Sequence, residues 1–180
     1  MSRKLDLLFE ALRRARDITG HTEFVVVGSL SALVHETRGP LPSAMTLSND
    51  FDAYTRADPE RMLDVVSALG EGSAFFAETG VFIDPVTPQL CTLPEGWEGR
   101  MHLLERDGVK VCFLDFADAA ISKYARGEPN DLRWIRAGIE AGLLDLDVVV
   151  KRLRFTRFLD ADEERSTRER VQRDLQRSNR

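Results

Sequence analysis

The spacing of apolar residues predicts an amphipathic helix at the beginning of the chain and a short buried strand after it. Apolar side chains recur at helical spacing between Leu5 and Leu12, and Gly20 ends the helical pattern. The four consecutive apolar residues 24–27 are typical of a buried strand. We therefore expect the helix to place its apolar stripe on a sheet that contains this strand.

A second strand and further helical segments follow. Residues 51–54 predict a short strand, and a helix is expected over residues 59–70, with Asp58 as its N-cap and proline at its first position. Residues 70–80 are expected to form a loop with a short apolar centre. Residues 81–86 predict a third strand that ends at proline.

The second half of the chain combines one hairpin with several helices. Residues 101–105 and 109–113 flank an Asp-Gly pair, which is a strong hairpin signal. Three helices are then expected, the first ending at Gly127, the second beginning at Pro129 and the third covering residues 145–158. The last segment, residues 160–180, is charged and has few apolar residues, so it is expected to be a solvated helix or a frayed tail.

These elements predict an α/β fold of the α+β type. A short mixed sheet of four or five strands would be backed by the N-terminal helix and closed by a C-terminal helical bundle. The length of 180 residues fits one domain with a helical appendage. We expect residues 1–114 to form the α/β core, residues 115–159 a helical part of the same domain, and residues 160–180 a charged tail.

Composition and charge restrict the class of protein. The hydrophobic fraction of 43% allows an ordinary globular core. Of the net charge of −5, residues 151–180 contribute ten Lys or Arg against six Asp or Glu, a net of +4, so residues 1–150 carry −9. A basic surface is therefore expected only near the C-terminus, and any contact with RNA would be local.

The same features predict a soluble, cytoplasmic protein. Cys91 and Cys112 lack the spacing of a metal site and are too few for a disulfide framework, so they are expected to be thiols in a reducing compartment. No apolar run approaches 18 residues, and the first helix does not resemble a signal peptide. No membrane association is expected.

Two carboxylates mark the second strand as a candidate metal site. Asp50 and Asp52 are two residues apart, and side chains at this spacing point to the same face of a strand. Like charges so close repel each other unless a cation lies between them. Carboxylate oxygens on a rigid strand suit Mg²⁺ or Mn²⁺ together with substrate phosphates. The alternative is an acidic edge that faces solvent.

Gly28 and Ser29 form a turn between the first strand and a helical pattern over residues 30–34. Backbone N–H groups and a hydroxyl at a helix start can bind an anion such as phosphate. The alternative is a tight turn in which the serine only caps the helix. A phosphate cradle that faces a metal-binding acid pair is typical of phosphoryl or nucleotidyl transfer.

This combination resembles the nucleotidyltransferase superfamily of the DNA polymerase beta type. Within it, the chain is most similar to small bacterial nucleotidyltransferase-like proteins that include toxins of toxin–antitoxin pairs. The resemblance covers about two-thirds of the chain. It extends to the segments LPEGWEGRM (residues 93–101) and LDFADAAISKYARGEPNDLRWIRAGIEAGLLD (residues 114–145).

The resemblance implies further site residues. A helix lysine and a following aspartate of the family match Lys123 and Asp131, and a third carboxylate from a neighbouring strand makes Asp84 a candidate metal ligand. Without the resemblance, these residues would be a solvated lysine, a first-turn helix acid and a strand-end acid. An arginine and a threonine commonly precede the acids in the family; here Thr46 and Ser48 remain, and Ser48 is a candidate for nucleotide binding. The chain departs from the family in its long insert at residues 36–44 and in lacking an arginine before the acids.

The implied function is Mg²⁺- or Mn²⁺-dependent transfer of a nucleoside monophosphate from a nucleoside triphosphate. The acceptor would be an RNA such as tRNA, a protein hydroxyl or a small molecule, and a cognate antitoxin is an expected partner. Lys123 would neutralise the triphosphate, and Asp131 would position that lysine or act on the acceptor hydroxyl. The alternative is a non-catalytic module with the same fold that binds a nucleotide or a partner protein.

Two further observations complete the set of candidates. Arg100, near Trp97, is an additional candidate for contact with phosphate. The three histidines are scattered along the chain, and we expect them to be structural or surface residues. His35 is the nearest of them to the proposed site, since it follows Gly28 on the same helical segment.

Overall fold

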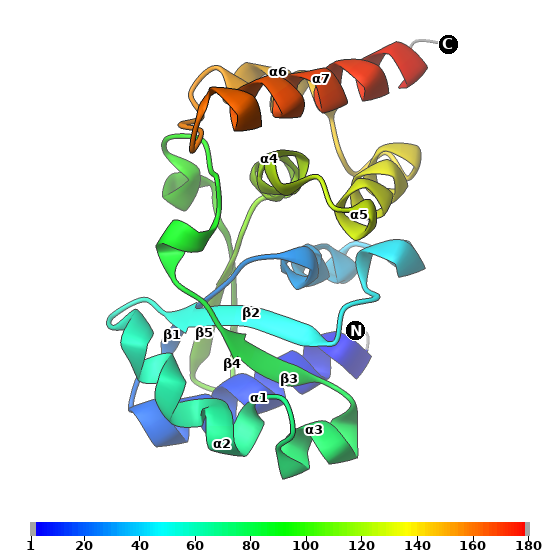
Figure 1. The fold of residues 1–180 in the computed structure, drawn as a ribbon. Coiled ribbons are helices and arrows are strands. Elements are labelled where there is room, and N and C mark those ends of the chain that lie inside the picture. The colour runs from blue at the N-terminus through cyan, green and yellow to red at the C-terminus, as the bar shows by residue number, and fades with distance from the viewer. Residues whose placement is uncertain (1–2, 179–180) are drawn as a thin grey trace.

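The computed structural model describes residues 3–178 as a mixed five-stranded sheet with helices on both sides (Figure 1). The order of the strands is β3-β2-β1-β5-β4. Strand β1 is antiparallel to β2 and parallel to β5, β2 is parallel to β3, and β4 and β5 form the expected hairpin. The strands are β1 (Glu23–Val26), β2 (Asp50–Thr55), β3 (Phe82–Pro85), β4 (His102–Arg106) and β5 (Val109–Phe113). The predicted fold class is confirmed.

One side of the sheet is covered by N-terminal helices (Figure 1). Helix α1 (Arg3–Thr19) buries the apolar stripe that its sequence predicted. The expected helix after Asp58 is a 3-10 helix, η3 (Pro59–Val65), that continues into α2 (Val66–Leu69). The Asp58 side chain accepts a hydrogen bond from the N–H of Glu60, so the predicted cap is confirmed.

Residues 70–80 were expected to form a loop, and the structure shows that they do not. It contains helix α3 (Ala74–Thr79), whose N-terminus is capped by the Ser73 hydroxyl and whose end is formed by Gly80 in the left-handed conformation. Phe75 is buried against the core. A buried aromatic residue between a serine cap and a glycine stop is enough to stabilise this short helix.

Four helices lie on the opposite side of the sheet (Figure 1). They are α4 (Phe116–Arg126), α5 (Pro129–Glu140), α6 (Leu146–Leu153) and α7 (Ala161–Ser178). Helix α4 begins at the Asp115 cap and ends at Gly127, as expected, whereas α6 ends at Leu153 and is shorter than residues 145–158. Short 3-10 helices η1 (Ser29–Thr37), η2 (Ser43–Met45), η4 (Pro88–Leu90) and η5 (Trp97–Arg100) join these elements. No helix in residues 3–178 has the length and apolar character needed to cross a bilayer.

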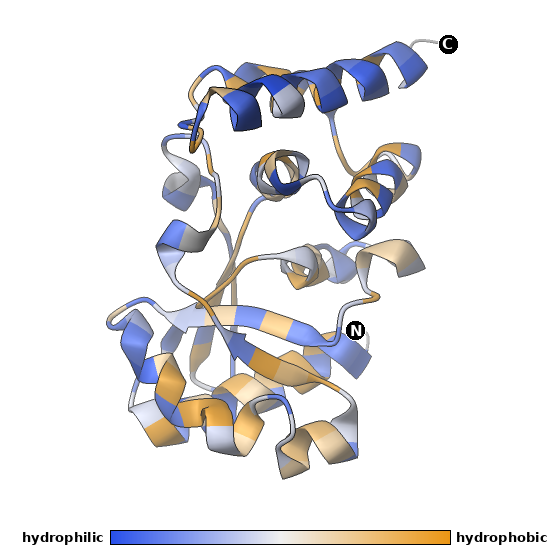
Figure 2. Ribbon diagram, in the orientation of Figure 1, coloured by the Kyte–Doolittle hydropathy of each residue, from blue (hydrophilic) through white to orange (hydrophobic). Residues whose placement is uncertain are grey.

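Helix α7 is more closely packed than the expected charged tail. It is hydrophilic over most of its length (Figure 2), yet Val171, Thr167 and Asp174 are buried. The Tyr124 hydroxyl of α4 donates a hydrogen bond of 2.9 Å to Asp174. Arg170 donates to the backbone carbonyl of Tyr124. The last segment is thus a helix, and one of its faces belongs to the C-terminal bundle rather than to solvent.

Candidate functional site

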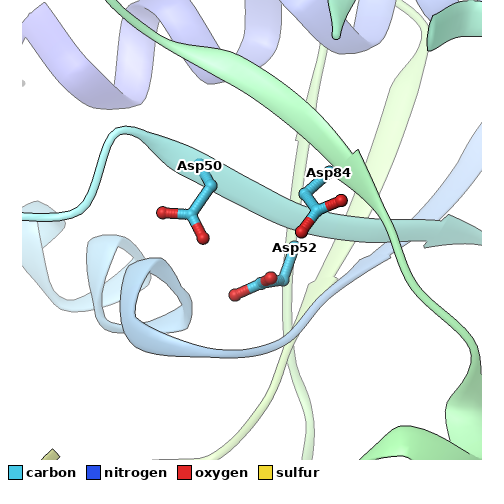
Figure 3. Close-up of side chains that lie close together, drawn as sticks. All are labelled: Asp50, Asp52 and Asp84. Atoms are coloured by element: carbon cyan, nitrogen blue, oxygen red, sulfur yellow. The ribbon is translucent and has the colours of Figure 1, made fainter. Parts of the chain in front are cut away.

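Three carboxylates converge at the edge of the sheet formed by β2 and β3. Alternation along β2 buries Phe51 and Ala53 on one face and leaves Asp50 and Asp52 together on the other. Strand β3 pairs with β2 in a parallel register that places Asp84 opposite Asp52. One oxygen of each of the three carboxylates lies within 4.8 Å of the others, and all three project toward the same space (Figure 3).

The electrostatics of this acid cluster favour a cation. Burial, followed by the charges of Asp50 and Asp84, raises the pKa of Asp52 to about 7. Burial and then Asp50 also raise the pKa of Asp84. Burial and mutual repulsion thus disfavour full ionisation of the cluster, and a bound cation would favour it. Three carboxylate oxygens without sulfur or imidazole fit Mg²⁺ or Mn²⁺.

The Gly28 backbone lies directly against the Asp52 side chain. Gly28 has a φ of +66°, and a Cβ atom on it would lie 1.9 Å from Asp52 Oδ2. The N–H of Val27 donates to the backbone carbonyl of Asp52 at 3.0 Å, which holds the end of β1 along β2. Glycine is therefore required here by both its left-handed conformation and the lack of space. The turn then opens the 3-10 helix η1 at Ser29.

Lys123 reaches this turn from α4. Its Nζ atom donates to Ser29 Oγ at 2.8 Å and to Asp131 Oδ1 at 3.1 Å. The side chain is only 3% exposed and lies 5.1 Å from the ring of Trp134. Trp134 in turn donates through Nε1 to the carbonyl of Ser29 at 3.1 Å. Lys123 is thus a buried residue that fixes the Ser29 turn, not a solvated lysine.

Asp131 holds two cations together. Besides Lys123, it accepts two hydrogen bonds from Arg126, at 2.7 and 2.6 Å, in the two-pronged geometry typical of guanidinium–carboxylate pairs. Burial opposes the ionised form of Asp131, but the hydrogen bonds from Arg126 and the charge of Lys123 outweigh it and lower its pKa. Asp131 is therefore a carboxylate that positions both basic side chains.

Arg126 is the site residue that sequence reasoning did not identify. Its side chain is 61% exposed, although its guanidinium is fixed on Asp131. It follows Lys123 by three residues, and this spacing places both on one face of α4. That spacing was the only available signal, and it is common on solvated helices.

A cavity of about 230 Å³ lies between the acid cluster and α4. Its lining includes Gly28, Asp52, Lys123 and Arg126. A further carboxylate and several apolar and small polar residues complete it, namely Glu163, Val27, Cys91, Thr92, Leu114, Ala119, Ser122 and Ala125. The cavity thus combines charged groups of both signs with apolar surface.

Ser48 supports the other side of the acid cluster. Its hydroxyl donates to Asp50, and its backbone carbonyl accepts a hydrogen bond of 2.5 Å from Lys4 of α1. Ser48 also lines a second, smaller hollow together with Ser29, Arg133 and Trp134. All eight residues expected at the site therefore lie in one region around the Gly28 turn.

Arg100 and the histidines lie outside this site. Arg100 donates to both oxygens of the fully buried Asp118, at 2.9 and 3.2 Å, so it has a structural role in place of the expected contact with phosphate. Arg152 shares the same carboxylate. His35 packs against Phe116 and His102, as expected for a structural residue.

Comparison with known proteins gives the family. No curated protein and no solved structure matches this chain. A family model described as "Nucleotidyltransferase of unknown function (DUF6036)" matches residues 3–178, which is nearly the whole chain. The match agrees with the acid cluster and with the glycine turn beside it. The chain therefore belongs to this nucleotidyltransferase family of unknown function.

Proposed function

We propose that this protein transfers a nucleoside monophosphate from a nucleoside triphosphate to a hydroxyl group, with the help of Mg²⁺ or Mn²⁺. The observation that supports this proposal best is the convergence of Asp50, Asp52 and Asp84 beside the Gly28 turn. Membership of a nucleotidyltransferase family supports the same reaction class.

The three carboxylates are the proposed metal ligands. A bound divalent ion would neutralise the phosphates and stabilise the charge that develops on the transferred group. The raised pKa of Asp52 supports this assignment, because a cation would relieve the repulsion that causes part of the shift. Ser48 keeps the Asp50 carboxylate oriented through its hydroxyl.

The triphosphate would lie between the Gly28 turn and α4. Ser29 and the adjacent backbone form one side, and Lys123 supplies a positive charge close to Ser29. Arg126 is the more accessible cation: Asp131 occupies its Nε and Nη2 atoms, and within residues 3–178 no hydrogen bond occupies Nη1. We assign phosphate binding to both residues, with Arg126 at the solvent side.

The role proposed for Asp131 is to position Lys123 and Arg126. Its side chain is as buried as that of Lys123 and carries hydrogen bonds from both cations. These contacts favour positioning over the alternative role, action on the acceptor hydroxyl. Asp84 is exposed and stands at the open edge of the sheet, so it is the better candidate to face an acceptor.

The test is incubation with each labelled nucleoside triphosphate, Mg²⁺, and total RNA or total protein. Transfer of label by the wild type, and not by the Asp50→Asn/Asp52→Asn variant, is the expected result. Nucleotide binding without any transfer would instead support the non-catalytic alternative. Absence of metal-dependent nucleotide binding would reject both nucleotidyl transfer and the non-catalytic nucleotide-binding role.

A second proposal, about the biological role, rests on the family resemblance and not on any contact in the structure. We propose that the protein acts as a toxin on tRNA or on a protein and is neutralised by a cognate antitoxin. Induced expression should then arrest growth of a bacterial host, and the Asp50→Asn/Asp52→Asn variant should not. Normal growth with active wild-type enzyme would reject the toxin role and leave the transfer reaction intact.

A further inference from the structure

Helix α7 reaches the cavity through Glu163. Thr92, in the segment after β3, donates through Oγ1 to the Glu163 carboxylate, at 3.2 Å to one oxygen and 3.3 Å to the other. Both residues line the cavity. The N-terminal end of α7 thereby meets a segment about seventy residues earlier in the chain (Figure 1).

The charged groups that line the cavity attract different parts of a nucleotide. Arg126 and Lys123, next to the proposed metal ligands, favour phosphate. Glu163 repels phosphate but accepts hydrogen bonds from N–H groups. Val27, Leu114 and Ala119 line the same cavity and offer apolar contact to a flat ring. A nucleotide would therefore bind with its base toward Glu163 of α7.

We infer that Thr92 and Glu163 select guanine, so that GTP is the donor nucleotide. The Watson–Crick edge of guanine presents an acceptor followed by two neighbouring N–H donors. Thr92 would turn its hydroxyl from Glu163 to that acceptor, and the Glu163 carboxylate could then accept from both donors. This inference rests on the proposed function, because it places the base of the same triphosphate.

The other bases match this pair poorly. Adenine would direct the lone pair of N1 at the carboxylate, and cytosine offers one amino donor beside two acceptors. Uracil offers a single N–H between two carbonyl groups. In each case the Glu163 carboxylate would face a hydrogen-bond acceptor of the base. In a partly buried site such an unmatched contact lowers the affinity for the nucleotide.

Glu163 also has a structural task, which the test must separate from base selection. It accepts a hydrogen bond of 2.7 Å from the N–H of Leu159, and its own N–H donates to Asp160 at 2.8 Å, so it helps to cap α7. A carboxylate has about four acceptor positions, so once Thr92 turns to the base, the bond from Leu159 leaves capacity for the two N–H donors of guanine. Loss of the cap would change stability but not the preference among nucleotides.

The experiment measures affinity for ATP, GTP, CTP, UTP and ITP in the presence of Mn²⁺. Wild type should prefer GTP over ATP by roughly tenfold or more, and ITP, which lacks the 2-amino group, should bind more weakly than GTP. Glu163→Gln should bring the ratio of GTP to ATP affinity close to one. The matched control is Glu164→Gln, since Glu164 pairs with Arg168 on the outer side of α7 and does not line the cavity. This control should retain the wild-type ratio.

Several outcomes would overturn the inference. Equal affinity for the four common nucleotides, a preference for another base, or an unchanged GTP preference in Glu163→Gln would reject guanine selection alone. A lower melting temperature of Glu163→Gln with an unchanged ratio would leave only the capping role. If no nucleotide binds with Mn²⁺, the proposed function fails and this inference fails with it.

Discussion

Gly28 and Asp52 are in such close contact that no other residue fits at position 28. A Cβ atom there would lie 1.9 Å from the Asp52 carboxylate, in a backbone conformation that L-residues rarely adopt. Gly28→Ala should therefore displace a proposed metal ligand. We expect loss of Mn²⁺ binding and of nucleotidyl transfer, together with about 1–2 kcal/mol of destabilisation from the backbone alone. Manganese titration and thermal unfolding measure the two effects.

Gly39→Ala is the matched control for this variant. A Cβ atom on Gly39 would meet no heavy atom within 4 Å beyond its chain neighbours, and its φ angle is not left-handed. The substitution should leave metal binding unchanged and stability unchanged or slightly higher. Full manganese affinity in Gly28→Ala would show that the close contact with Asp52 has no functional consequence.

Divalent metal should stabilise the protein through the acid cluster. Mg²⁺ or Mn²⁺ relieves the repulsion among Asp50, Asp52 and Asp84, so the melting temperature should rise relative to protein in EDTA. Asp50→Asn/Asp52→Asn should lose that response. In EDTA, the variant should be at least as stable as wild type, because two like charges are removed. Asp64→Asn, on η3 and paired with Arg61, serves as the control. An equal metal response in wild type and double variant would remove the metal site.

Lys123→Ala should weaken both stability and nucleotide binding. A solvated lysine would leave stability unchanged, but the 3% exposed Lys123 loses two buried hydrogen bonds, at a cost of about 1–3 kcal/mol. A charged contact with phosphate is worth about 1.5–3 kcal/mol, or about ten- to a hundredfold in affinity. Lys123→Arg should restore binding only in part, because a planar guanidinium does not replace a compact ammonium. Chemical unfolding and nucleotide titration separate the two effects.

Arg126→Ala provides the comparison for Lys123. Nucleotide affinity should fall, and stability should fall as well, because the buried Asp131 loses its two hydrogen bonds from the guanidinium. Arg13→Ala, on the distant surface of α1 and paired with Asp107, should change neither. If Lys123→Ala binds nucleotide as tightly as wild type, Lys123 has no part in phosphate binding and only supports the Ser29 turn.

Removal of α7 should destabilise the domain. From its composition, truncation after Leu159 would be harmless, but the structure buries Val171 against the bundle and pairs Asp174 with the buried Tyr124. Loss of these contacts should cost at least about 2 kcal/mol. Tyr124→Phe removes only the hydroxyl and should cost about 1 kcal/mol. If the truncated chain had the same melting temperature as wild type, the packing role of α7 would be contradicted.

His35 should make the protein sensitive to acid. Burial, and then the neighbouring charges of His102 and Arg38, lower the pKa of His35 from 6.5 to about 4. The unfolded chain therefore binds this proton more readily than the folded chain, and stability is lost as the pH falls from about 6.5 toward 4. His35→Gln should reduce this loss, as measured by urea unfolding at several pH values. His21→Gln is the parallel control, and an identical acid dependence in wild type and His35→Gln would contradict the assignment.

The local parts of the fold were predictable because local signals determine them. The acids of β2 follow from their spacing, and the ends of α4 follow from Asp115 and Gly127. Helix α3 was missed although its capping serine and terminal glycine were present, because its apolar run is too short to show a period. The role of Asp84 depended on which strands pair, and only the resemblance to a known family suggested it.

The distant contacts of the site could not be read from the sequence. Arg126 and Glu163 look like solvated helix residues, and their places in the cavity depend on how α4 and α7 pack. Lys123 and Asp131 were expected at the site, but their burial and the sharing of Asp131 with Arg126 are properties of the assembled bundle. The composition of α7 predicted a solvated segment, but one narrow buried face is enough to pack a largely charged helix against the bundle.

The hydrogen bond from Trp134 to the carbonyl of Ser29 has a consequence for synthesis of the chain. It spans 105 residues, and the contact between Lys123 and Ser29 spans 94. During translation, the strands that carry the acids leave the ribosome long before α4 and α5 do, and contacts between distant segments form late. A nascent chain would thus hold the acid cluster with no buried lysine to fix the glycine turn. Competence to bind a nucleotide should arise only after α4 and α5 have left the ribosome, so a shorter nascent chain would be inert toward its substrates.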